Sequence, residues 1–474
     1  MNSLQRDVVI IGTGTAGMTA YRSALAHTSS VLAIEGGPYG TTCARVGCMP
    51  SKLLIAAAEA AHSAGEAHRF GVHLTPPRID GAQVMQRVRD ERDRFVGFVT
   101  EAVDKWPAEH RLQGHARFVA PGVLQVDEHT RIEAQRIVIA TGSTPDVNPA
   151  WRQTLGDRLI INDDVFDWQT LPAAVAVVGT GVIGLELAQA LHRLGVRVRL
   201  YGRSGRVGPL TDPLLQALSA QIFATALPMS LGVELTVARD GDQVLVTTAA
   251  GTERFDYLLA ATGRAPNVKH LGLEHAGLPL GANGVPIADS NTGQIGNSAV
   301  FLAGDASDEH MLLHEAADDG RIAGDNAGRY PDLRVRPRRA PLAVVFSDPQ
   351  IMLAGASYTQ LLHQGLAFQA GQVSFEDQGR SRVMLKNRGA LRVYAECGSG
   401  RFLGAEMIGP AAEHLGHLLA WSAQRGDTVQ EMLDSPFYHP VIEEGLRSAL
   451  RELQRALHMG PPPVERCLDC GPGG

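Results

Sequence analysis

The sequence predicts an α/β protein with two Rossmann-like βαβ units and a separate C-terminal α+β domain. Short β-branched runs alternate with helical stretches along most of the chain, which is typical of strands in parallel sheets. Two strand-to-helix junctions carry the same glycine pattern, and beyond residue 340 alternating strands are followed by helices. The length of 474 residues leaves room for roughly two to four domains.

The first unit carries a dinucleotide-binding fingerprint between a strand and a helix. It comprises the strand Asp7–Ile11, Gly12-Thr-Gly-Thr-Ala-Gly17, a helix to about His27 and the strand Val31–Ile34. The first glycine permits the sharp turn, the second lets the backbone approach a pyrophosphate, and the third lets helix and strand pack closely. Glu35 ends the second strand, where a carboxylate can accept both ribose hydroxyls. This unit is therefore predicted to bind a dinucleotide.

The second unit repeats the fingerprint but differs where the ribose of its nucleotide would lie. It comprises the strand Ala174–Val178, Gly179-Thr-Gly-Val-Ile-Gly184, a helix to about Leu194 and the strand Val196–Tyr201. Gly202 stands where an NAD site needs an acid, and Arg203 and Arg206 follow it. Loss of the carboxylate removes repulsion against a 2′-phosphate, which guanidinium groups bind well. We therefore predict NADP(H) rather than NAD(H); the alternative is that both arginines are solvated loop charges.

Two of the five cysteines, Cys43 and Cys48, lie close together just after the first unit. A sparse pair beside a nucleotide-binding unit indicates a redox dithiol rather than a structural cross-link. A disulfide that closes so short a ring has little loop entropy to contribute and tends to be strained, hence reducible. The sequence thus predicts a redox enzyme.

Composition argues against several other classes of protein. The formal net charge of -7 and the lack of a basic run argue against a nucleic-acid-binding protein. No apolar stretch has the length needed to span a bilayer, so no membrane partner is expected. The N-terminal residues lead directly into the first strand and leave no room for a signal peptide, so a cytoplasmic protein is expected.

Further motifs extend over essentially the whole chain. They are Ala140-Thr-Gly-Ser143, Ala261-Thr-Gly-Arg264, Val300-Phe-Leu-Ala-Gly-Asp305, Gly114-His-Ala116, Met311-Leu-Leu-His-Glu315 and Phe437-Tyr-His-Pro-Val-Ile-Glu-Glu444. With the two fingerprints and the dithiol, they resemble the pyridine nucleotide–disulfide oxidoreductases. Met311–Glu315 and Gly184-Leu-Glu186 look most like the dihydrolipoamide dehydrogenase branch. Because that branch normally uses NAD, the likeness conflicts with the NADP(H) prediction and leaves the direction of the reaction open.

The resemblance implies an FAD-binding domain, an NAD(P)-binding domain and a C-terminal α+β dimerisation domain. The expected limits are 1–150 and 276–338 for FAD, 151–275 for NAD(P), 339–460 for dimerisation and 461–474 for a tail. The residues expected to bind FAD are Gly12, Gly14, Gly17, Glu35, Gly36, Thr42, Lys52, Ala116, Thr141, Gly142, Asp305 and Leu313. Those expected to bind the nicotinamide nucleotide are Gly179, Gly181, Gly184, Arg203, Arg206, Gly263 and Arg264. No metal site is predicted.

The resemblance also implies the redox roles. Cys48 would be the thiolate beside the flavin, and Cys43 the thiol that exchanges with a small dithiol or disulfide of the lipoamide type. Lys52 and Glu186 would pair near the flavin.

His439 would be the general acid or base for thiol exchange, oriented by Glu444. An imidazole suits this task because its ordinary pKa lies near neutrality, and a carboxylate partner fixes its tautomer. In the family this histidine reaches the partner subunit's disulfide, so a homodimer is expected.

Several features leave alternatives open. Arg45 replaces the family's usual Asn; it could stabilise a thiolate, attract an anionic substrate or point to solvent. Arg22 lies where glutathione reductase has a glutathione-contacting arginine. Cys467 and Cys470 could pass electrons to a protein disulfide or a metal ion, as in thioredoxin or mercuric reductases, or be incidental. Two thiols alone are too few for a zinc site. No redox role is expected for Cys397.

Overall fold

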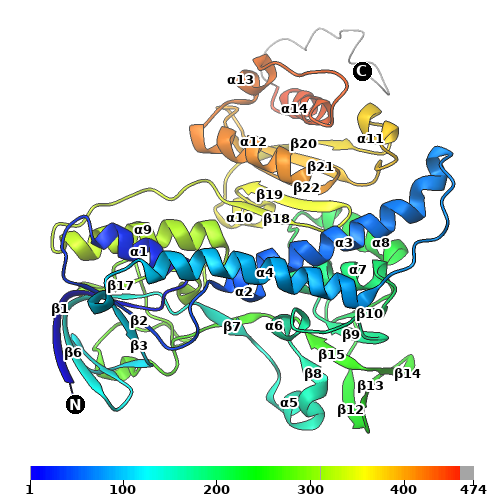
Figure 1. Cartoon of the computed structure of the whole chain (residues 1–474). Coiled ribbons are helices and arrows are strands. Elements are labelled where there is room, and N and C mark those ends of the chain that lie inside the picture. Colours follow the sequence, from blue (N-terminus) through cyan, green and yellow to red (C-terminus); the bar gives the residue numbers. More distant parts are fainter. Residues whose placement is uncertain (1, 310, 459–474) are drawn as a thin grey trace.

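The structure is a computed structural model that describes residues 2–309 and 311–458, and its first sheet joins strands from distant parts of the chain (Figure 1). In spatial order the strands are β3 (Arg111–Gln113), β2 (Val31–Glu35), β1 (Asn2–Ile11), β6 (Thr130–Ile139), β5 (Val123–Val126) and β4 (Ala116–Ala120), with β17 (Val300–Leu302) also paired to β6. β1, β2, β3, β6 and β17 run parallel, whereas β4, β5 and β6 form an antiparallel meander. The first glycine turn follows β1 at the carboxyl edge of this sheet.

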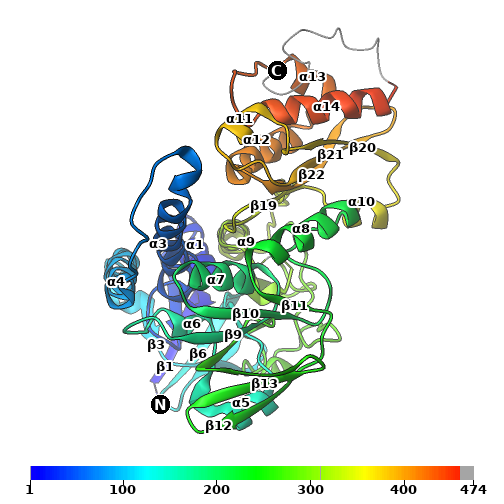
Figure 2. The same ribbon diagram turned by 90° about the vertical axis from the view of Figure 1, so that its right-hand side faces the viewer.

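The second sheet is parallel throughout and carries the second glycine turn. Its order is β11 (Met229–Leu231), β10 (Arg197–Gly202), β9 (Ala174–Val178), β15 (Tyr257–Ala260) and β8 (Leu159–Ile160). Nearby lies the antiparallel sheet β12 (Thr236–Asp240), β13 (Gln243–Thr248) and β14 (Gly251–Phe255), seen below β9 and β10 in Figure 2. β7 (Ser143–Pro145) and β16 (Arg264–Pro266) pair where the chain crosses between the first two sheets.

The third sheet forms the C-terminal domain, which stands above the rest of the molecule in Figure 1. Its antiparallel order is β18 (Leu342–Val345), β19 (Gln350–Gly355), β22 (Phe402–Gly409), β21 (Ala390–Glu396) and β20 (Phe368–Ser374). The long helices α12 (Ala412–Arg425) and α14 (Glu444–Ala456) pack on it.

The remaining helices connect or cover these sheets. They are α1 (Thr15–Ala24), α2 (Thr42–Val46), α3 (Cys48–Glu66), α4 (Gly81–Asp104), α5 (Pro149–Leu155), α6 (Asn162–Val165), α7 (Val182–Arg193), α8 (Pro213–Ala226), α9 (Leu313–Arg329), α10 (Tyr358–His363), α11 (Gly379–Val383) and α13 (Val429–Asp434). Short 3-10 helices lie at Ala67–Phe70, Ala108–His110, Gly156–Arg158, Leu273–His275 and Gly304–Ser307. Within the described part of the chain, none of the helices is long and apolar enough to cross a membrane. The predicted fold class is confirmed; the predicted domain limits stay a prediction, and the tail lies outside the described residues.

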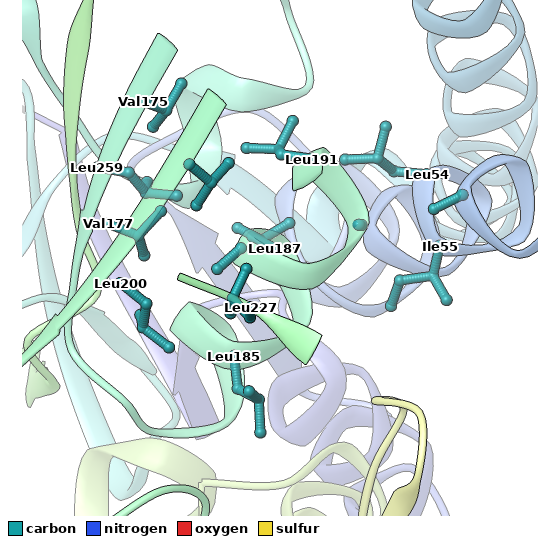
Figure 3. Close-up of a cluster of buried hydrophobic side chains, with 14 of the residues drawn as sticks. Leu54, Ile55, Val175, Val177, Leu185, Leu187, Leu191, Leu200, Leu227 and Leu259 are labelled. Carbon is teal, nitrogen blue, oxygen red and sulfur yellow. The ribbon is translucent and has the colours of Figure 1, made fainter. Parts of the chain in front are cut away.

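Helix α7 lies between the second sheet and α3, as Figure 3 shows. Its Leu185, Leu187 and Leu191 are fully buried and belong to the same apolar cluster as Val177 of β9 and Leu54 of α3. Each such leucine contributes about 1.5–3 kcal/mol by leaving water. The cluster therefore fixes α3, which begins at a predicted redox cysteine, against the helix of the second fingerprint.

Helices α1 and α9 approach each other closely because α9 presents glycines at the crossing. A Cβ atom on Gly320 would lie 2.2 Å from the backbone oxygen of Ala16, and one on Gly324 would lie 2.3 Å from that of Ala20. Neither clash can be relieved by moving a flexible side chain. The first fingerprint helix is thus seated on α9 by backbone contact.

Gly320→Ala is expected to destabilise the protein by about 1–3 kcal/mol, because the added methyl group overpacks this crossing. Gly65→Ala is the matched control. Like Gly320, Gly65 lies in a helix, but it is exposed and its Cβ would meet open space. The control should be neutral or stabilised by up to about 1 kcal/mol. Denaturant unfolding of both variants measures the difference, and equal unfolding midpoints would contradict the close-packing argument.

Candidate active site

Both predicted redox cysteines lie at a break between two helices. Thr41 caps α2 by accepting a hydrogen bond from the Ala44 backbone N–H at 3.2 Å. At Gly47 the chain leaves helical geometry, with φ -126° and ψ -115°, and α3 then begins at Cys48. Cys48 therefore lies at the N-terminus of a 19-residue helix, whose dipole favours a thiolate.

The two cysteine thiols differ in acidity. The Cys43 thiol donates a hydrogen bond to Cys48, and this bond, with the nearby charge of Lys52, lowers the pKa of Cys48 to about 7 against the opposing effect of burial. The same hydrogen bond and burial raise the pKa of Cys43. Cys48 is thus the sulfur that ionises first, as the role expected for it requires.

Lys52 and Glu186 form the ion pair expected from the sequence. Lys52 Nζ lies 2.7 Å from Glu186 Oε2, joining α3 to α7. The Glu186 side chain is 4% exposed, whereas that of Lys52 is 33% exposed. The second carboxylate oxygen, Oε1, accepts a hydrogen bond from the Phe346 backbone N–H at 2.8 Å. Sequence analysis did not assign Phe346 a role, because it follows β18, far along the chain from both charges.

One cavity of about 460 Å³ brings these groups together with both glycine turns of the first domain. Its lining includes Gly14, Thr42, Cys43, Cys48, Lys52, Gly142, Glu186, Arg264, Asp305 and Leu313. A Cβ on Gly14 or Gly142 would meet open space. The Thr141 Oγ1 atom is buried without a hydrogen-bond partner among the described residues. Open glycine turns beside the dithiol, and an orphaned hydroxyl within the second of these turns, fit the phosphate and flavin parts of an FAD molecule.

The first fingerprint has the geometry that its glycines predict. Gly12 has φ +104°, and a Cβ there would lie 2.4 Å from Ala140 O; one on Gly17 would lie 1.9 Å from Gly12 O. Glu35 accepts hydrogen bonds from the Thr13 backbone N–H at 2.9 Å and its hydroxyl at 2.6 Å. The turn and the carboxylate are therefore held together before any ribose is bound.

The other predicted FAD residues occupy less informative positions. Gly36 faces His115, whose Nδ1 atom would lie 2.5 Å from an added Cβ. Ala116 is buried at the start of β4. Asp305 Oδ2 accepts a hydrogen bond from Ser143 Oγ at 2.7 Å. Arg264 Nε in turn donates to Ser143 Oγ at 2.8 Å. Ser143, which bridges Asp305 and Arg264, was not predicted as a site residue; its place in the motif Ala140-Thr-Gly-Ser143 was the signal that could have indicated it.

A larger cavity of about 1110 Å³ lies over the second fingerprint. Its lining includes Gly179, Gly181, Gly202, Arg203, Arg206 and Gly263, together with the acids Asp146 and Glu234. Gly184 lies beneath the turn, where its Cβ would be 1.9 Å from Gly179 O. Both arginines are exposed, and neither forms an ion pair with a carboxylate in residues 2–309 and 311–458. Their guanidinium groups are available to an anionic ligand.

His439 and Glu444 form a pair at the start of α14. The imidazole Nδ1 lies 3.1 Å from both carboxylate oxygens of Glu444, and the carboxylate also accepts from the Val441 backbone N–H and from Arg447. Glu444 is buried, whereas the His439 side chain is 43% exposed. Within one chain, His439 does not line the cavity that holds the cysteines.

Arg45, Arg22 and Cys397 do not line the cavity that holds the two cysteines. Arg45 lays its aliphatic stem beside Gly40, and the cation that acts on Cys48 is Lys52. Arg22 is exposed in the last turn of α1, and Cys397 is exposed after β21. Cys467 and Cys470 lie outside the described residues. Among the described residues, no three His, Cys, Asp or Glu side chains are grouped to hold a metal ion.

Residues 6–320 match the family described as pyridine nucleotide-disulphide oxidoreductase, and residues 342–450 match its dimerisation domain. A mercuric reductase from Shigella flexneri is 31% identical over 468 residues, covering 94% of this chain and 81% of the relative. A dihydrolipoyl dehydrogenase from Pseudomonas aeruginosa is 31% identical over 486 residues, covering 96% of this chain and 99% of the relative.

Solved structures show the same fold over nearly the whole chain. LpdA from Mycobacterium tuberculosis is 25% identical with a TM-score of 0.81, covering 96% of this chain and 100% of that one. The HOCl-induced flavoprotein disulfide reductase RclA from Escherichia coli is 23% identical with a TM-score of 0.79, covering 94% and 99%, and this likeness shows the fold alone.

Lys52→Met is expected to raise the apparent pKa of the Cys43–Cys48 pair by about one unit, because the thiolate loses its neighbouring cation. The reduced wild-type pair should alkylate with a midpoint near the pKa of about 7 given for Cys48. Alkylation rates against pH, followed by mass spectrometry of the peptide with both cysteines, give this value. Lys105→Met, at an exposed lysine after α4, is the control; an equal shift in both variants would contradict the local effect.

Proposed function

The chain belongs to the pyridine nucleotide-disulphide oxidoreductases and is an FAD-dependent flavoprotein that uses a pyridine nucleotide; we propose that it prefers NADPH and acts on a small disulfide or dithiol of the lipoamide type. The net reaction in the reductive direction is NADPH + H⁺ + RSSR → NADP⁺ + 2 RSH. The observation that carries the proposal is the single cavity in which Cys43, Cys48 and the Lys52–Glu186 pair face the open glycine turns.

FAD, when bound, supplies two-electron transfer between the nicotinamide and the dithiol, and Gly14, Thr141, Gly142 and Asp305 are the residues suited to hold it. Lys52 keeps positive charge beside Cys48 and so maintains that sulfur as a thiolate. Glu186 holds Lys52 in place and is itself shielded from water.

Thiol exchange follows from the unequal acidities of the two cysteines. Cys43 loses its proton to a base and attacks one sulfur of the substrate, which breaks the substrate S–S bond and releases one thiolate. That thiolate takes up a proton. Cys48, as a thiolate, then attacks the Cys43 sulfur, forming the protein disulfide and releasing the second half of the substrate, which is protonated in turn.

We assign the base to His439 of the partner subunit. The dimerisation domain implies a homodimer, and within one chain the imidazole and the cysteines are not brought together. The buried Glu444 carboxylate holds Nδ1, which directs the other ring nitrogen outward on a half-exposed side chain.

Preference for NADPH is supported by the charges of Arg203 and Arg206 in the larger cavity, which pair with no carboxylate of the described residues, and by Gly202 at the position where an NAD site has an acid. A carboxylate there would repel the 2′-phosphate. Glu234 lines the same cavity on a segment whose backbone is bonded to the arginine loop, with the Val233 N–H donating to Gly202 O at 3.2 Å, but among the described residues it forms no ion pair with either arginine.

A second candidate function is reduction of a protein disulfide or a metal ion through Cys467 and Cys470. It is favoured by the similarity to mercuric reductases across nearly the whole chain. Electrons would leave the Cys43–Cys48 dithiol by exchange with the tail cysteines of either subunit.

Anaerobic titration with NADPH, and in parallel with NADH, tests the proposal. NADPH should reduce the yellow protein rapidly. After about one two-electron equivalent, a long-wavelength charge-transfer band between the Cys48 thiolate and the oxidised flavin should appear. The double variant Arg203→Gln/Arg206→Gln should raise the KM for NADPH by about 10- to 100-fold and leave NADH little changed, because two contacts to the 2′-phosphate are lost.

Arg254→Gln, which removes an exposed arginine in β14 of the same domain, is the control for charge alone. Faster reduction by NADH than by NADPH would contradict the cofactor preference. Uptake of about one further two-electron equivalent, lost in Cys467→Ser, would favour the second candidate function.

Hybrid dimers test the role of His439. Cys48→Ser and His439→Gln homodimers should each be nearly inactive. A co-expressed mixture should recover about a quarter of wild-type activity, because half of the dimers are hybrids and each has one complete site. Disulfide reduction is measured on the mixture and on each homodimer; a mixture no more active than the homodimers would contradict a shared site.

A further inference from the structure

One face of α7 is hydrogen-bonded to a short segment of the C-terminal domain, residues 346–349, which joins β18 to β19. Gln189 and Asp348 form two hydrogen bonds, from Gln189 Nε2 to Asp348 O at 2.9 Å and from Asp348 N–H to Gln189 Oε1 at 2.7 Å. Arg193 lies 2.7 Å from Asp348 Oδ2, with both side chains largely buried. With Glu186, these residues occupy one side of the helix, so the segment is held at three successive points.

Phe346, at the near end of this segment, contacts both members of the charged pair. Its backbone N–H donates to Glu186 Oε1, and Lys52 Nζ lies 4.7 Å from the centroid of its ring. The ring also lines the cavity that holds the two cysteines. A residue of the C-terminal domain thus touches the carboxylate with its backbone and the ammonium group with its side chain.

We propose that Phe346 is a positioning residue: its ring and backbone N–H fix the Lys52–Glu186 pair, so that the seating of the C-terminal domain sets the charge beside Cys48. This inference rests on the proposed function, since it concerns the same dithiol. It gives the dimerisation domain a second effect on the redox site, within one chain and separate from the partner subunit's His439.

Two contacts fix the position of the Lys52 ammonium group: the Glu186 carboxylate and the Phe346 ring. The Lys52 side chain is flexible and one-third exposed. With the ion pair alone, its ammonium group could occupy several positions around the Glu186 carboxylate. The negative face of an aromatic ring attracts an ammonium group within about 6 Å and restricts it to one side. Glu186 cannot rotate to follow, because its other oxygen is bonded to the backbone of the same phenylalanine.

Several influences act on the Cys48 charge. Hydrogen bonds from the Cys43 thiol and from the Cys48 backbone N–H stabilise the thiolate, as does the charge of Lys52, whereas burial and Glu186 oppose it. Displacing Lys52 while Glu186 remains would therefore leave the opposing charge in place. Loss of the Phe346 ring should raise the pKa of Cys48 without removing any charged group.

The test is a pH titration of the long-wavelength thiolate band in the two-electron-reduced holoenzyme. Phe346→Leu should raise the apparent pKa by about 0.5–1 unit, which is a roughly three- to tenfold loss of thiolate relative to thiol at a fixed pH. Phe346→Tyr, which keeps an aromatic face, should titrate as the wild type does. Phe98→Leu is the matched control, because Phe98 is an exposed aromatic residue with its own cation, Arg94, at 5.8 Å.

Arg193→Met provides a second route if Phe346→Leu does not fold, because it loosens Asp348 and hence the segment from outside the cavity. It should shift the titration in the same direction. A wild-type midpoint in Phe346→Leu, or in Arg193→Met where only that variant folds, would overturn the inference. Absence of the band from the wild-type protein at every pH would instead overturn the proposed function.

Discussion

The arrangement of the redox centre depends on one buried carboxylate, that of Glu186. A buried charge is tolerated only where its partners compensate for the lost hydration, and here each oxygen has one: the Lys52 ammonium group and the Phe346 backbone N–H. The three residues come from α3, α7 and the C-terminal domain. If any one of these elements were displaced, the buried carboxylate would lose a partner or be displaced itself. The Glu186 charge is therefore compensated only when α3, α7 and the C-terminal domain are packed together.

Two other buried carboxylates repeat this device at the nucleotide side. Glu406 of β22 is fully buried and accepts hydrogen bonds from the backbone of Thr211, Asp212 and Tyr358. Asp212 in turn accepts from Arg392 and from the Tyr394 hydroxyl. These bonds tie the loop after the second fingerprint to the C-terminal sheet. The loop beside the larger cavity and the Lys52–Glu186 pair are therefore both hydrogen-bonded to the C-terminal domain.

Local features were predictable from the sequence, and contacts between distant segments were not. The predicted strand Ala174–Val178 coincides with β9, and both glycine turns have the conformation that their spacing requires, because a turn is decided by adjacent residues. The Lys52–Glu186 pair followed only from the family resemblance. Phe346 could not be found in this way, since its contact with Glu186 spans 160 residues and its type carries no chemical signal. The opposite holds for Arg45, whose conspicuous charge is not among the main influences on the pKa of either cysteine.

The two halves of the site differ in how strongly the fold constrains them. Arg203 and Arg206 are exposed on a loop, and their side chains form no ion pair with the described residues, so a change there alters the charge at the larger cavity with little effect on packing. Lys52 is bound to a carboxylate and an aromatic ring from two other domains, so a change there is felt across their junction. The charge at the larger cavity can therefore be changed independently of the thiol chemistry, whereas the acidity of Cys48 depends on contacts between α3, α7 and the C-terminal domain.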